Sequence, residues 1–134
     1  MDRKKKCLVI RELIGFILLT VLLLGGLLSS FLLGNLHREL ARDMDSAAWY
    51  ALRQDWEEAT QIYTQTADVW RKKWNLCAAF SDHTPMEHID AQFAQLSVYA
   101  SLRNREEFAA TCSALSKDLT AMGKAQELRW WNLF

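Results

Sequence analysis

The sequence has few residues that interrupt a helix: one proline and five glycines among 134 residues. A β-sandwich or β-barrel needs many short strands separated by turns rich in these two residues, so the composition argues against both folds. A chain of this length has room for one domain of modest size. We therefore expect an all-α protein, in which an N-terminal transmembrane helix continues into an antiparallel bundle of about four helices.

The sequence also lacks the short motifs that carry common chemistries. It has no glycine-rich phosphate loop, no glycine-framed serine elbow and no pair of cysteines separated by two residues. Basic residues form no stripe beyond the N-terminal tail, which argues against nucleic acid as a partner. We therefore expect neither an enzyme nor a bound cofactor.

One long run of apolar residues contains no charge. Residues 13–33 match the roughly 30 Å hydrocarbon layer at about 1.5 Å per residue. A secretory signal peptide usually has a shorter run and a small-x-small cleavage site, so an uncleaved anchor is favoured. Residues 1–12 hold five basic and two acidic side chains, and the positive-inside rule keeps them in the cytoplasm. We expect a single-pass plasma-membrane protein, in contact with lipid, whose residues 35–134 form an extracytoplasmic bundle.

Small residues gather near the end of this apolar run. Gly26 and Ser30 would let another transmembrane helix approach closely, although small residues are common in membrane helices without such a contact. Gly15-Phe16 after a basic leader also resembles the processing site of type IV pilin-like proteins. That site requires a glutamate where this sequence has Thr20, so we do not favour the pilin interpretation.

Two helices are expected between the apolar run and residue 81, because apolar residues recur there at helical spacing. The first continues from the membrane run to Arg53. Asp55 is the expected N-cap of the second, which extends to Phe80. The predicted core-facing residues are Leu36, Leu40, Met44, Ala47, Ala48, Ala51 and Leu52 in the first helix and Trp56, Ala59, Ile62, Tyr63, Thr66, Val69, Trp70, Trp74, Cys77 and Phe80 in the second.

Two more helices are expected after residue 83. Thr84 is a predicted N-cap, Pro85 occupies the first helical position, and Glu87 completes a capping box. This third helix should end near Arg103, and the fourth should break at Gly123. Their predicted core-facing residues are Met86, Ile89, Phe93, Leu96, Tyr99, Ala100 and Leu102, then Phe108, Cys112, Leu115, Leu119 and Met122.

A weak internal similarity supports these boundaries. Residues 51–59 align with residues 101–109 at an offset of 50 residues, and both stretches predict a tight turn between two helices. They also resemble a tetratricopeptide hairpin. The 34-residue period of that repeat is absent, so a bundle is preferred to a solenoid.

If the helices alternate up and down from the membrane, two aromatic-rich segments return to its surface. At about 1.5 Å per residue, the second helix reaches that level near Trp74 and the fourth near Gly123. The basic residues 71–73 there are compatible with anionic headgroups or with a solvated helix face. Closure of the bundle core is the competing explanation for the C-terminal aromatic cluster. Because indole rings favour the headgroup level, we predict membrane-interface or interaction roles for Trp70, Trp74, Trp130, Trp131 and Phe134.

The three cysteines are not expected to pair. Cys7 lies on the reducing cytoplasmic side, whereas Cys77 and Cys112 lie outside, where a disulfide is chemically permitted. In the predicted bundle the heights of Cys77 and Cys112 differ by roughly 22 Å. A disulfide needs Cα atoms within about 7 Å, so we predict two separate, mostly buried thiols.

Metal-ligand residue types cluster in one place, between Asp82 and Asp90. Glu87 already has a capping role there, and acidic side chains are favoured near a helix N-terminus by its dipole. We therefore expect no metal. If one binds, the weak candidate ligands are His83, Glu87 and His88.

Several features together give the chain a family resemblance. A basic leader, one anchor and paired tryptophans precede the motif DHTPMEHID at residues 82–90, and WNLF ends the sequence. In these features the chain resembles a family of small membrane-anchored helical proteins of spore-forming bacteria, grouped as domain of unknown function four-three-six-three. The resemblance implies a cell-envelope location and supplies no activity or site residues.

The expected function is that of a non-enzymatic protein of the cell envelope. An anchored bundle of this kind would bind another protein or serve a structural role at the membrane. The alternative is a sensory module that binds a small ligand or metal in the bundle core or near His83–His88. A chain without a second span or cytoplasmic output domain argues against signalling alone.

Overall fold

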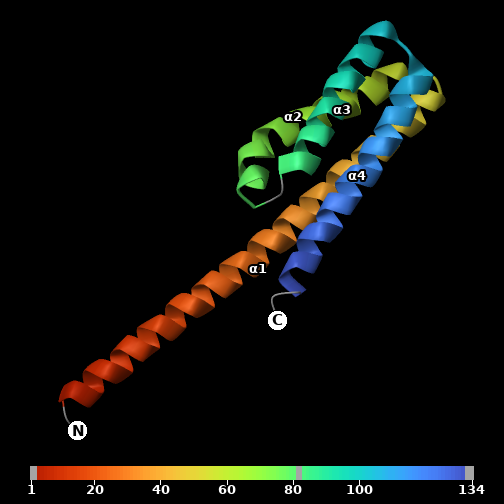
Figure 1. The fold of residues 1–134 in the computed structure, drawn as a ribbon. Helices are drawn as coiled ribbons and strands as arrows, with labels where there is room; N and C mark the ends of the chain where they lie inside the picture. Colours follow the sequence, from red (N-terminus) through yellow and green to blue (C-terminus); the bar gives the residue numbers. More distant parts are fainter. Residues whose placement is uncertain (1–2, 81–82, 132–134) are drawn as a thin grey trace.

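The protein is almost entirely helical in the computed structural model, which describes residues 3–80 and 83–131 (Figure 1). Four helices follow one another in this part of the chain: α1 (Arg3–Leu52), α2 (Trp56–Phe80), α3 (His83–Leu102) and α4 (Arg105–Trp131). They alternate in direction, and the N-terminal half of α1 projects away from the others (Figure 1). The predicted all-α class, with a long apolar helix that continues into a bundle, is confirmed.

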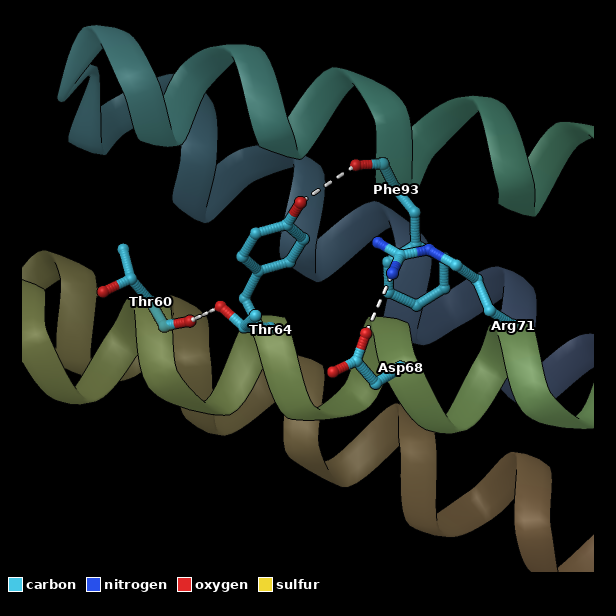
Figure 2. A network of polar contacts seen from close by, with 6 residues as sticks. Thr60, Thr64, Asp68, Arg71 and Phe93 are labelled. Atoms are coloured by element: carbon cyan, nitrogen blue, oxygen red, sulfur yellow. Dashed lines mark hydrogen bonds and ion pairs between the residues drawn. The ribbon is translucent and has the colours of Figure 1, made fainter.

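The helix α1 packs along α4 over the longest stretch and along α2, while α3 packs mainly on α4 and contacts α2 little. Aromatic rings fill the part of the core near the first turns of α2 and α4. There the Phe108 ring lies 5.1 Å from that of Trp56 and 5.7 Å from that of Tyr63, between centroids. The Tyr63 hydroxyl donates to the Phe93 carbonyl at 3.4 Å, which ties α2 to α3 (Figure 2). The predicted stripes supply most of this core.

Both turns between antiparallel helices at the far end of the bundle have the same design. Gln54 and Arg103 adopt left-handed backbone conformations, with φ of 69° and 53°. In the first turn the Asp55 amide donates to the Tyr50 carbonyl at 3.0 Å, closing the helix end as in a Schellman motif. The second turn repeats this bond from Asn104 to Tyr99, also at 3.0 Å.

The next helix is capped in the same way in each turn. The Asp55 carboxylate accepts from the Glu58 amide, and the Asn104 side-chain oxygen accepts from the Glu107 amide, each at 3.3 Å. The prediction of two equivalent turns is confirmed, as is the Asp55 cap. The equivalent capping residues are 49 positions apart, one fewer than the sequence similarity suggested.

Some predicted details differ from the structure. The helix α4 continues through Gly123 to Trp131, so the predicted break is wrong: the residue is needed for close packing instead of a turn. The helix α3 begins at His83, one residue before the predicted cap. Three residues assigned to the core are exposed because they lie at helix ends or on the rim: Leu52, Leu102 and Val69, at 66%, 70% and 39%.

Candidate membrane-interface site

The helix α1 has two halves with opposite surroundings. Between Val9 and Leu32 nearly all large apolar side chains are exposed. Only 11% of the most apolar stretch of 18 residues in this helix is buried within the protein. From Leu33 to Ala51 the same helix supplies core residues. The helix is long and apolar enough to cross a membrane. A core helix of a water-soluble domain would be mostly buried, and an apolar surface of this extent is unusual on a protein that faces only water.

The lower end of α4 runs alongside the last turns of the apolar half of α1. The Ser30 hydroxyl donates to the Gln126 carbonyl at 3.1 Å, and Ser30 is 8% exposed. About two turns beyond Ser30 on α1, Arg38 pairs with Glu127 at 2.7 Å. The C-terminal part of α4 therefore overlaps in height with residues 26–33, inside the segment predicted to cross the membrane.

This packing uses the small residues of the apolar run. Ser30 is buried and Gly26 is partly buried, whereas Gly25 has open space around it. Gly123 of α4 lies so close to α1 that a Cβ there would be 3.3 Å from the His37 Cβ and 3.5 Å from the Gly34 carbonyl oxygen. Within the described residues, the face of α1 that carries the small residues Gly26 and Ser30 is thus covered by α4 of the same chain. The contact also places Gly123 level with Gly34, as the predicted helix heights required.

Among the Asp, Glu, Lys, Arg and His side chains that the structure describes, His37 alone is buried, at 0% exposure. Its ring meets the edge of Trp70 with 6.3 Å between centroids. Burial lowers the pKa of His37, and this outweighs the Leu33 backbone and the Gln126 side chain, which favour the protonated ring. Neither ring nitrogen has a hydrogen bond of good geometry. The ring is therefore neutral near pH 7. Sequence periodicity does not single it out, because histidine occurs both in cores and on surfaces.

The aromatic residues predicted for the membrane interface have different environments. Trp70 is 1% exposed and stacks on Phe93 at 6.1 Å, so this ring belongs to the core and is not placed at the surface. Trp74 is partly buried and meets the edge of Trp70 at 5.8 Å. Trp130 and Trp131 lie in the last turn of α4, but their side chains are outside the described part of the structure, as is the whole of Phe134. For these three residues the interface role stays a prediction.

The candidate metal ligands do not converge in the described part of the chain. No group of three or more His, Cys, Asp or Glu side chains is arranged there to hold a metal ion. His88 instead approaches Asp118 of α4, with 3.3 Å between its Nε2 and the carboxylate, and the same carboxylate accepts from Gln92 at 2.9 Å. His83 and Glu87 are exposed. His88 therefore serves a contact between α3 and α4.

Cys112 is a free, fully buried thiol in α4. Burial raises its pKa to about 12, and the negative charge of Asp45 adds to the effect. A thiol with so high a pKa is a poor nucleophile. The side chain of Cys77 lies outside the described residues, so the prediction that the two cysteines stay apart is supported only by the free state of Cys112.

The far end of the bundle carries exposed apolar side chains of its own. Trp49 is 50% exposed and Leu52 is 66% exposed, one turn apart on α1. The Arg53 guanidinium covers the Trp49 ring, with 4.4 Å from its carbon to the ring centroid. Tryptophan and arginine are enriched among residues that dominate protein interfaces. Sequence periodicity did not single out this surface, because Trp49 falls outside the core-facing stripe.

Comparison with known proteins gives a family but no activity. The family described as Domain of unknown function (DUF4363) matches residues 27–133, which is most of the chain and includes the end of the apolar run. Searches of curated proteins and of solved structures returned no significant match.

Proposed function

We propose that this chain, which belongs to the DUF4363 family, is a single-pass membrane protein that holds a non-enzymatic helical bundle against the outer face of the plasma membrane. Residues 13–33 would be the anchor, residues 1–12 a cytoplasmic tail, and residues 35–134 an extracytoplasmic interaction or structural domain of the cell envelope. The orientation rests on the excess of basic residues in the tail.

One observation carries this proposal. A single uninterrupted helix changes from apolar and exposed to apolar and buried at Leu33. Because the buried half is fixed in the bundle, the exposed half is rigidly continuous with it. Lipid around residues 13–32 would remove the exposed apolar surface from water without any change in the bundle.

The interaction role is supported by the surface farthest from the proposed membrane. Trp49 and Leu52 lie on the last turn of α1 and Arg53 follows directly after it, so all three would face away from the lipid. The chemistry suits a protein partner, since the surface combines an exposed indole, an aliphatic side chain and a stacked guanidinium.

A pair of double substitutions tests the anchor. Leu19→Arg with Leu22→Arg places two charges among side chains that are 55% and 72% exposed. At the bilayer centre this costs about 5 kcal/mol or more, so the protein should be released from membranes by alkaline carbonate. The matched control, Leu52→Arg with Leu102→Arg, changes leucines that are 66% and 70% exposed at the far end of the bundle.

The two variants distinguish a chain anchored through residues 13–33 from a chain that is not anchored there. If the anchor is correct, the first variant leaves the membrane fraction and the control remains in it. Equal behaviour of the two variants would refute the anchor. Protease digestion of intact cells checks the orientation, because the bundle should be cut from outside while an epitope at the N-terminus stays protected.

A further inference from the structure

Three residues from three helices mark one level near the base of the bundle. His37 of α1 contacts the ring of Trp70 of α2, and Gly123 of α4 packs on the Cβ of the same histidine. His37 lies four residues beyond Leu33, the end of the proposed anchor. Gly123 also lies against the Gly34 carbonyl, so at about 1.5 Å per residue this level is roughly 2 to 6 Å above the hydrocarbon boundary.

Basic side chains lie just below this level on two of the helices. Both α2 and α4 run back toward the proposed membrane, so Lys72 and Lys73 are about 3 to 4.5 Å lower than Trp70, and Lys124 is about 1.5 Å lower than Gly123. All three lysines are exposed. The headgroup layer on each side of a bilayer is roughly 5 to 7 Å thick, so the ammonium groups fall within it.

Two carboxylates near these lysines are paired with arginines. Asp68 is paired with Arg71 at 2.8 Å (Figure 2). Glu127 is paired with Arg38 at 2.7 Å. Among the ion pairs of the described residues, none includes Lys72, Lys73 or Lys124. Asp90 lines a shallow depression together with Arg71, Trp74 and Asn75.

The opposite end of the bundle has more carboxylates than basic side chains. The first turn of α2 carries Glu57 and Glu58, and the first turn of α4 carries Glu106 and Glu107. Arg53, Arg103 and Arg105 also lie at this end, so it carries both signs with an excess of carboxylates, whereas Lys72, Lys73 and Lys124 are exposed near the base. A negatively charged surface would attract the lysines near the base and repel the excess of carboxylates at the far end.

We propose that Lys72, Lys73 and Lys124 form a collar that binds the phosphate groups of anionic phospholipids around the anchor. This rests on the proposed anchoring of α1. The collar holds the base of α2 and α4 against the leaflet, and it does so in proportion to the anionic lipid content. The half-buried Trp74, one residue beyond Lys73, extends the contact with an indole ring at the same depth.

Hydrogen–deuterium exchange on the full chain in lipid nanodiscs tests the collar. The segment around residues 70–75 should exchange at least threefold more slowly in discs of phosphatidylcholine with 30% phosphatidylglycerol than in discs of phosphatidylcholine alone. About 0.5 M salt should abolish the difference, because charges are then screened within a few ångströms.

Two charge-matched variants complete the experiment. Lys72→Gln with Lys73→Gln should lose the lipid dependence at residues 70–75, whereas Arg103→Gln with Arg105→Gln, at the far end, should keep it. Equal exchange in the two lipids, or a lipid dependence that survives the lysine substitutions, would overturn the collar. Failure of the chain to enter nanodiscs at all would instead refute the anchor, so the two proposals fail in different ways.

Discussion

The hydroxyl of Ser30 donates to the main-chain oxygen of Gln126, 96 residues further along the chain, at 3.1 Å. This bond joins the exposed apolar half of α1 to the lower end of α4. A polar group at this depth in a membrane needs a partner within the protein, because lipid tails offer none. The bundle therefore extends into the height range of the proposed anchor instead of stopping above it.

The close approach of α4 to α1 depends on Gly123. Any side chain there meets the Cβ of His37, which cannot swing away as the end of a long side chain would. We expect Gly123→Leu to destabilise the bundle by about 1 to 3 kcal/mol through overpacking. Gly25→Leu is the control, because nothing lies within 4 Å of a Cβ at that position. Chemical unfolding in detergent micelles measures both, and equal stabilities would contradict the packing at Gly123.

The stability of the bundle should depend on His37 as the pH falls. Burial lowers its pKa below the ordinary value of 6.5, so the unfolded chain binds the proton more readily. Neutral His37 makes its full contribution to the free energy of unfolding above pH 6.5. Below that pH the free energy of unfolding falls by up to about 1.4 kcal/mol per pH unit, until the folded-state pKa is reached. Tryptophan fluorescence during urea unfolding at pH values from about 5 to 8 measures this slope.

Matched histidine variants assign the slope to one residue. His37→Gln should flatten it, whereas His88→Gln should not, because the His88 side chain is 66% exposed. Asp43 has a raised pKa, from burial and then from the charge of Glu39. Its effect on the slope has the opposite sign, because the folded state then binds the proton more readily than the unfolded chain. A slope that persists in His37→Gln would refute the assignment.

Periodicity predicted the helices well because most apolar residues between 36 and 122 follow one face of their helix. The Asp55 cap was predictable for a similar reason: a short acceptor side chain before a helix has one common role. The predicted break at Gly123 failed because glycine serves two purposes, ending helices and letting them touch. Sequence spacing does not distinguish these uses, whereas the contact with His37 does.

The site was only partly predictable. The heights of the returning helices followed from residue counts, and Gly123 does lie level with Gly34. Periodicity places Trp70 on the core-facing stripe, whereas its depth alone suggests the interface, and its ring lies in the core. His37 was missed because a buried histidine is recognised by its neighbours on other helices, which no local pattern contains.

The two left-handed turn residues allow a stabilising substitution. Gln54 has φ of 69°, a conformation that costs a residue with a Cβ more than it costs glycine. We expect Gln54→Gly to raise the free energy of unfolding by up to about 1 kcal/mol. Gln61→Gly, in the middle of α2 on an exposed position, should lower it by about 1 kcal/mol. Urea unfolding of the two variants measures these changes, and the same sign for both would show that the turn is not formed in this way.

The far-end surface predicts where a protein partner makes contact. A photoreactive benzoyl-phenylalanine at position 49 should form a discrete adduct in native membranes, because Trp49 is 50% exposed beside Leu52. The same probe at Gln61, on an exposed position of α2, should give much less. Leu52→Glu should reduce the adduct at position 49 several-fold, since it places a charge in the apolar contact. An adduct of twice the chain mass would identify a second copy as the partner. Equal labelling from positions 49 and 61 would exclude a specific contact at this surface.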